Sequence, residues 1–84
     1  MPAQPYLETI SLIHAGDWES AHQLIQRYNT ETACWIHAHL HRIEGDLWNA
    51  NYWYDRAGKQ APDITLQQEL DQIKSFILNE SGKR

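Results

Sequence analysis

The chain has 84 residues, of which 42% are hydrophobic, and a formal net charge of −4. The hydrophobic content excludes a disordered tail, and the length corresponds to one domain over residues 1–84. Acidic and basic residues are spread over both halves, so the chain offers no basic stripe for nucleic acid and no polybasic patch for a membrane surface. Valine is absent and alternating apolar runs are scarce, which favours an all-α fold.

Two helices are predicted in the first third of the chain. Pro5 can begin a helix that extends to about His14, and Gly16 can end it, because glycine tolerates the left-handed conformation of a helix terminus. Asp17 can then cap a second helix, whose apolar residues recur at helical spacing to about Asn29. The short turn between the two helices predicts an antiparallel hairpin.

A second hairpin is predicted over residues 30–58. Thr30 or Thr32 can cap a helix that runs to Glu44, and Gly45 ends it. Asp46 then caps a fourth helix, which Gly58 terminates. The apolar stripe of the first of these helices is Ala33, Ile36, Leu40 and Ile43, and that of the second is Leu47, Ala50, Trp53, Tyr54 and Ala57.

A last helix follows a loop over residues 58–63. Its apolar residues have i, i+4, i+7 and i+11 spacing, and they are Leu66, Leu70, Ile73 and Ile77. The other face is polar, as expected of a helix that caps a stack of hairpins, and we expect residues 80–84 to be frayed. The sequence thus predicts five helices, arranged as two hairpins and a C-terminal capping helix.

The segment over residues 34–62 resembles a tetratricopeptide repeat. In that family a Gly-Asp type turn, a small residue, an aromatic residue, a second small residue and a proline recur in this order, and the chain has Gly45-Asp46, Ala50, Tyr54, Ala57 and Pro62. A weaker copy, with Gly16, Asp17 and Ala21, lies 29 residues upstream. The run over residues 41–58 is also similar to small uncharacterised bacterial proteins, which implies a bacterial setting.

The first helix of this repeat departs from the family pattern. Where the family has a large aromatic, a leucine, a small residue and a tyrosine, the chain has Cys34, His37, Ala38 and His41. Only the small residue agrees, and two core positions are occupied by histidine.

The resemblance implies that the first helices of the hairpins line a concave surface that binds a protein or peptide partner. Trp35, His39 and Arg42 share one side of the third predicted helix and are the candidate partner-binding residues. The alternative is an ordinary solvated face with one tryptophan. Trp48 and Tyr52 point away from the inner stripe of the fourth helix and could pack on the last helix or on a second subunit in a homodimer.

A second set of polar residues follows another stripe of the third helix. Cys34, His37, His41 and Glu44 lie at i, i+3, i+7 and i+10. We expect them to form a buried polar cluster with Tyr54, in which the histidines hydrogen-bond to residues of the fourth helix, namely Asn49, Tyr52, Tyr54 or Asp55. On this interpretation the protein binds no metal and no cofactor.

The alternative is a small metal-binding or metal-dependent protein that uses His37, His41 and Glu44. Histidines at i and i+4 can hold one zinc ion, but one helix face cannot surround it, so Asp46 or Asp55 would have to contribute. Cys34 with His37 or His41 is the one nucleophile and base pair that the sequence suggests. A cysteine in the middle of a core helix is usually inert, so no catalytic residue is predicted and the protein is expected not to be an enzyme.

The chain carries no feature of export. Its single cysteine cannot form an internal disulfide, and the N-terminal Met-Pro-Ala-Gln-Pro lacks the cationic and apolar regions of a signal peptide. No apolar stretch approaches the roughly 20 residues of a membrane-spanning helix. The sequence therefore predicts a cytoplasmic protein that binds a partner without covalent chemistry.

Overall fold

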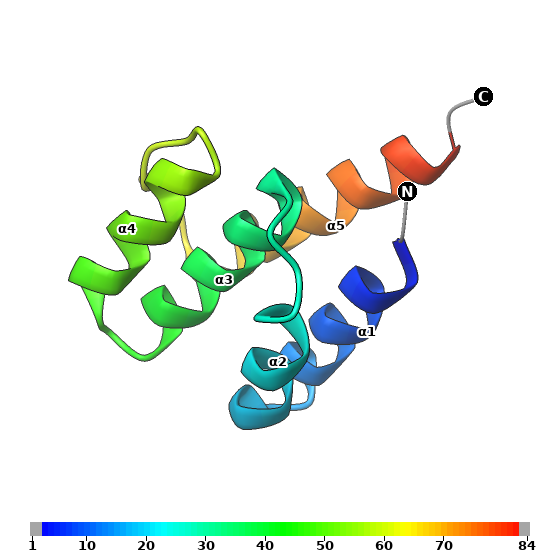
Figure 1. Ribbon diagram of the computed structural model, residues 1–84, viewed down its shortest axis with the longest axis horizontal. Helices are drawn as coiled ribbons and strands as arrows, with labels where there is room; N and C mark the ends of the chain where they lie inside the picture. The colour runs from blue at the N-terminus through cyan, green and yellow to red at the C-terminus, as the bar shows by residue number, and fades with distance from the viewer. Residues whose placement is uncertain (1–2, 83–84) are drawn as a thin grey trace.

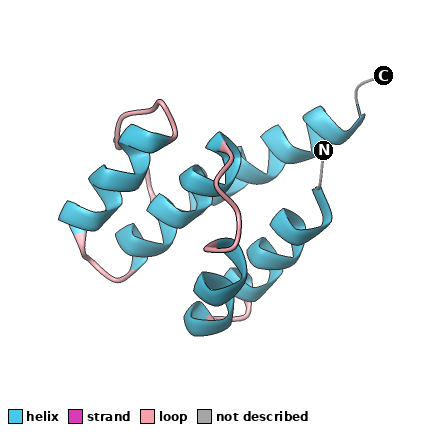
Figure 2. Ribbon diagram, viewed as in Figure 1, coloured by secondary structure: helices cyan, strands magenta, loops and turns pink. Residues whose placement is uncertain are grey.

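The computed structural model describes residues 3–82, which fold into helices joined by turns and loops and contain no strand (Figures 1 and 2). The predicted all-α fold of five helices is confirmed. The helices are α1 (Ala3–His14), α2 (Trp18–Ile25), α3 (Glu31–Ile43), α4 (Leu47–Arg56) and α5 (Leu66–Gly82). Within this range no helix is long and apolar enough to cross a membrane.

Matching turns close the two hairpins. Gly16 and Gly45 have φ angles of 80° and 82°, which glycine adopts without the penalty of a Cβ atom. Asp17 and Asp46 follow them, and each aspartate side chain accepts a hydrogen bond from the backbone N–H three residues further on, at 3.2 and 3.3 Å. The sequence signals for these turns are therefore confirmed.

Three helix boundaries differ from the prediction. α2 ends at Ile25 rather than near Asn29, because the backbone tightens into a turn in which Tyr28 N–H donates to the Ile25 carbonyl at 3.1 Å. α1 begins before Pro5, whose missing N–H is harmless in a first turn. α5 continues through Gly82, so the expected fraying is wrong for residues 80–82, and residues 83–84 lie outside the described range.

α3 is the central helix of the domain (Figure 1). It packs against α4 in the second hairpin and also against α2 and α5, whereas α1 packs against α2 and α5. Every side chain from Thr32 to His41 is consequently buried. The apolar core residues that α3 contributes are Ala33, Cys34, Trp35, Ile36, Ala38 and Leu40.

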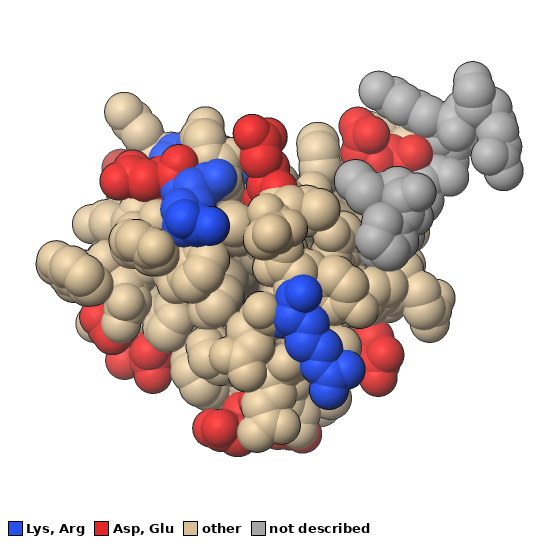
Figure 3. Space-filling view, viewed as in Figure 1, with Lys and Arg blue, Asp and Glu red and all other residues tan. Residues whose placement is uncertain are grey.

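α5 covers α1 and α3, which are the first helices of the two hairpins. Its buried face consists of Glu69, Leu70, Ile73 and Ile77. The capping helix therefore lies over the side of the hairpins that the repeat resemblance assigns to a partner. Charged side chains of both signs are scattered over the face of the molecule shown in Figure 3, among wider uncharged areas.

Candidate functional site

The three residues predicted to bind a partner converge instead on Glu69 of α5. Trp35 Nε1 donates to Oε2 of Glu69 at 3.1 Å, while His39 Nδ1 and Arg42 Nη1 donate to Oε1 at 2.7 and 2.9 Å. Trp35 and His39 are only 8% and 1% exposed, and Arg42 is half-buried. The predicted accessible binding surface is therefore wrong, because α5 occupies it.

The carboxylate of Glu69 is held in its ionised form by its donors. Glu69 is fully buried, and burial raises its pKa, but hydrogen bonds from His39, Tyr54 and Arg42 outweigh that effect and lower the pKa to about 2. Tyr54 donates at 2.5 Å, and the pKa of its hydroxyl is raised by burial and then by this bond. Two donors meet each oxygen, so the roughly four acceptor positions of the carboxylate are filled and the site is structural.

A different cluster lies between the two hairpins and contains three histidines. His22 comes from α2, whereas His37 and His41 come from successive turns of α3. Nε2 of His22 and Nε2 of His37 are 3.1 Å apart, and one nitrogen of each of the three rings lies within 4.8 Å of the others. His22 is half-buried and the other two are buried. Sequence reasoning missed His22, because it lies in another hairpin.

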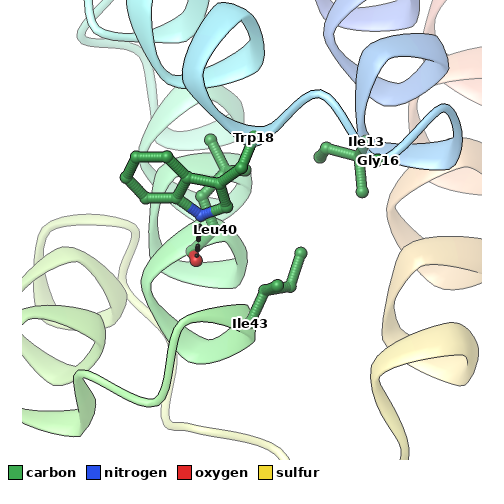
Figure 4. A pocket seen from close by; sticks show the side chains of 5 residues that line it. All are labelled: Ile13, Gly16, Trp18, Leu40 and Ile43. Atoms are coloured by element: carbon green, nitrogen blue, oxygen red, sulfur yellow. Dashed lines mark hydrogen bonds between the residues drawn. The ribbon is translucent and has the colours of Figure 1, made fainter.

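Two tryptophans fix the orientation of these rings. Trp53 of α4 stacks on His37 with ring centroids 3.9 Å apart, and Trp18 of α2 stacks on His22 at 4.8 Å. Trp18 is itself held by a hydrogen bond of 2.7 Å from Nε1 to the Leu40 carbonyl, as Figure 4 shows. It also lines an apolar pocket of about 80 Å³ with Ile13, Gly16, Leu40 and Ile43. Trp18 thus contacts both this apolar pocket and the rings of His22 and His41.

The environment keeps His37 uncharged at neutral pH. Burial, followed by the nearby His22 and His41, lowers the pKa of His37 to about 4. The pKa of His22 is also lowered, first by burial and then by His41. His22 and His37 form a hydrogen bond between their Nε2 atoms. When both rings are neutral, one Nε2 carries the hydrogen and donates it, and the other Nε2 accepts it.

The predicted buried polar cluster is divided among separate surroundings. Cys34 is buried, but its Sγ lies 4.0 Å from the Asn29 carbonyl oxygen, and Tyr54 belongs to the Glu69 site. His37 and His41 contact His22 rather than hydrogen-bonding to α4. The predicted composition is therefore wrong at Cys34 and Tyr54.

Glu44 also differs from the prediction, because its side chain is 39% exposed rather than buried. Its Oε2 accepts a hydrogen bond of 2.7 Å from Nδ1 of His41. Ligand atoms of His41, Glu44 and Asp46 lie within 4.8 Å of one another, whereas His37 belongs to the group with His22. The predicted ligand set of His37, His41 and Glu44 therefore does not converge. The group that converges is His22, His37 and His41, and Glu44 is hydrogen-bonded to His41.

No model of a protein family matches the chain, and no curated protein or solved structure matches it significantly. The resemblance to tetratricopeptide repeats therefore rests on the turn, small, aromatic and proline residues of the sequence.

Proposed function

We propose that the protein binds one transition-metal ion, of the class to which Zn²⁺ belongs, through His22, His37 and His41. The observation that carries this proposal is the convergence of three imidazole nitrogens from two hairpins within 4.8 Å. Three histidines are a known protein ligand set for zinc, with a fourth position left for water or another ligand.

The distances suit such an ion after a small adjustment. Zinc to nitrogen bonds of 2.0–2.1 Å in a tetrahedral site put neighbouring ligand nitrogens about 3.3 Å apart. The nitrogens of His22 and His37 are already 3.1 Å apart, and the nitrogen of His41 lies within 4.8 Å of them. The proposed ion therefore requires the nitrogen of His41 to come to about the same distance from the other two as they are from each other.

The chemistry of the ligands selects the class of metal. Imidazole nitrogen suits Zn²⁺, Cu²⁺ and Ni²⁺, whereas Mg²⁺ and Ca²⁺ prefer oxygen ligands. A histidine must be neutral to bind a metal, and the lowered pKa values of His22 and His37 favour that form at neutral pH. The thiol of Cys34 contacts the Asn29 carbonyl instead, so the proposed ligand set is entirely nitrogen.

A metal at this position would join the two halves of the domain. His22 belongs to the first hairpin, and the other two ligands belong to the second. A small domain buries a modest share of its surface, so an ion that binds only the folded state adds a useful increment of stability. This proposal departs from the sequence expectation of no bound metal, which assumed that the histidines are satisfied by α4.

Zinc titration of metal-free protein tests the proposal. Protein stripped with chelator is titrated with ZnSO₄ by calorimetry, and bound zinc is counted by elemental analysis. We expect one zinc per chain, and we expect His22→Ala, His37→Ala and His41→Ala each to lose it. His14→Ala is the matched control, because His14 is exposed at the end of α1 and should bind as the wild type does. Wild-type protein that binds no zinc would overturn the proposal.

A second candidate function is non-covalent protein binding through the outer face of α4. Leu47, Trp48 and Tyr52 are 63%, 77% and 46% exposed, and the rings of Trp48 and Tyr52 stack with centroids 6.5 Å apart. They do not pack on the last helix, because α5 lies against α1 and α3. We propose a second copy of the chain as the partner, since exposed tryptophan and tyrosine are typical interface residues.

Sedimentation equilibrium over a range of protein concentrations tests this second candidate. We expect the wild type to dimerise and the Trp48→Ala, Tyr52→Ala double variant to remain monomeric with an unchanged helical circular dichroism spectrum. A wild-type protein that stays monomeric throughout would rule out this pairing.

A further inference from the structure

The turn between α3 and α4 reproduces the turn between α1 and α2 bond for bond. In the second turn the N–H of Asp46 donates to the carbonyl of His41 at 3.0 Å. In the first turn the N–H of Asp17 donates to the carbonyl of Leu12 at 2.9 Å. In each case this bond ends the first helix of the hairpin, and the residue before the aspartate is a glycine with a positive φ angle. The two turns therefore provide an internal comparison of what the backbone requires.

The side chains at the end of the first helix of each hairpin differ completely. Leu12 and Ala15 in the first hairpin correspond to His41 and Glu44 in the second, because the copies are 29 residues apart. The first turn forms with an apolar pair at these positions, so the turn itself does not require a histidine and a carboxylate. The hydrogen bond of 2.7 Å between Nδ1 of His41 and Oε2 of Glu44 is therefore not required by the backbone of the turn.

That hydrogen bond determines which nitrogen of His41 carries a lone pair. With its hydrogen on Nδ1 and directed at Glu44, the neutral ring has its lone pair on Nε2. A carboxylate that accepts from the distal N–H of a metal-bound histidine fixes the tautomer and the ring orientation, and it makes the ring a stronger ligand.

Asp46 is less suited to this role although it is nearby. Its two side-chain oxygens accept from the backbone N–H and the side-chain amide of Asn49, at 3.3 and 2.6 Å. These bonds cap α4, and they also lower the pKa of Asp46. The carboxylate in contact with His41 is that of Glu44.

We infer that Glu44 is a positioning residue of the proposed metal site: it orients His41 and directs Nε2 toward the ion without binding the ion itself. This inference rests on the proposed function for its metal-binding half. Its other half, the tautomer of His41, holds for the metal-free protein and can be measured separately.

The first experiment measures that tautomer without metal. Long-range ¹H–¹⁵N NMR spectra of chelator-treated protein distinguish a protonated nitrogen from one with a lone pair. We expect the hydrogen of His41 on Nδ1 in the wild type and a mixture of tautomers in Glu44→Ala. A wild-type hydrogen on Nε2 would overturn the inference, whether or not zinc binds.

The second experiment measures zinc affinity by competition with a chromophoric chelator. Removal of such an outer carboxylate typically weakens metal binding about 10-fold to 100-fold, and we expect this loss in Glu44→Ala. Glu44→Gln should recover part of it, because the amide oxygen can still accept the Nδ1 hydrogen. Glu8→Gln is the control for the change in charge, since Glu8 is exposed on α1.

The outcomes separate this inference from the metal proposal. Zinc that binds Glu44→Ala as tightly as it binds the wild type would leave the three-histidine site standing and remove the role of Glu44. Loss of zinc from Glu44→Gln as complete as that from His37→Ala would make Glu44 a direct ligand and overturn the inference. A wild type that binds no zinc would refute the metal site, and the tautomer measurement would still decide the orientation of His41.

Discussion

Tyr54 of α4 and Glu69 of α5 are joined by a buried hydrogen bond of 2.5 Å, in which the tyrosine hydroxyl donates to Oε2. Tyr54 is also the aromatic residue of the repeat-like pattern, and it is 1% exposed within the buried core. One side chain therefore serves both the packing of that hairpin and the attachment of the last helix. The remaining donors to Glu69 all come from α3.

Glu69→Gln should destabilise the protein strongly. A glutamine offers one acceptor oxygen and turns an N–H group toward the donors at the other position. The hydrogen bonds of Trp35 and Tyr54, or those of His39 and Arg42, are then disrupted. Breaking a buried ionic network from one side typically costs about 3–5 kcal/mol. Urea denaturation at pH 7 measures this loss. The exposed Glu8→Gln should remain within about 0.5 kcal/mol of the wild type.

The free energy of unfolding should decrease at acid pH, because protonation of Glu69 removes the stabilisation that its ionised carboxylate provides. The folded pKa of about 2 lies below the ordinary value of 4.5, so the stabilisation is complete above pH 4.5 and is lost as the pH falls toward 2. The groups that face this carboxylate are His39, Arg42 and Tyr54. The difference in free energy of unfolding between wild type and Glu69→Gln should therefore narrow below pH 4.5.

The midpoint of this titration can be observed directly. Carbon-13 NMR of the Glu69 carboxyl group should give a midpoint well below 4.5 in the folded protein. A midpoint at or above 4.5 would mean that burial outweighs the hydrogen bonds, and the predicted acid sensitivity would then have another source.

Trp35→Phe should cost more than its change in volume suggests. The indole N–H of Trp35 donates to the buried carboxylate of Glu69, and hydrogen bonds to charged groups contribute about 1.5–3 kcal/mol. Trp48→Phe is the matched control at a protein concentration where the chain is monomeric, because Trp48 is 77% exposed in the single chain and its substitution should then be nearly neutral. Equal effects of the two substitutions in urea denaturation would place Trp35 outside the network.

The helices were predictable because their signals are local. Each hairpin turn depends on a glycine with a positive φ angle, at Gly16 and Gly45. Each also depends on an aspartate, Asp17 or Asp46, that bonds to residues three to five positions away. Such local signals can be recognised in the sequence. The end of α2 was misplaced because the helical periodicity continues to Tyr28, whereas the backbone turns after Ile25.

The surroundings of α3 were not predictable from a single helical pattern. An amphipathic pattern predicts one buried face, but α2, α4 and α5 all pack against α3. The pattern therefore predicts Trp35 and His39 at the surface, although both are buried. It predicts no role for Glu69, because a glutamate in a polar helix usually faces water. Glu69 lies one position before Leu70 and four before Ile73, so it adjoins the apolar face of α5. This spacing is a weak sequence signal of burial, and the tertiary structure is needed to identify its partners.

Zinc should raise the melting temperature of the wild type and leave that of His22→Ala unchanged. An ion that binds only the folded state adds about 2.7 kcal/mol at a free concentration 100 times its dissociation constant. His22 is the ligand from the first hairpin, so its removal leaves two ligands on α3 and no connection between the hairpins. Differential scanning calorimetry with zinc and with excess chelator measures the shift.

The metal-free proteins supply the control for this last prediction. His22 is half-buried and stacks on Trp18 with ring centroids 4.8 Å apart, so His22→Ala should lose some stability even in chelator. The zinc effect is therefore the difference between the two conditions within each variant, and His14→Ala should show the full wild-type difference. If His22→Ala gains as much from zinc as the wild type does, the ion does not join the hairpins and the bridging role fails.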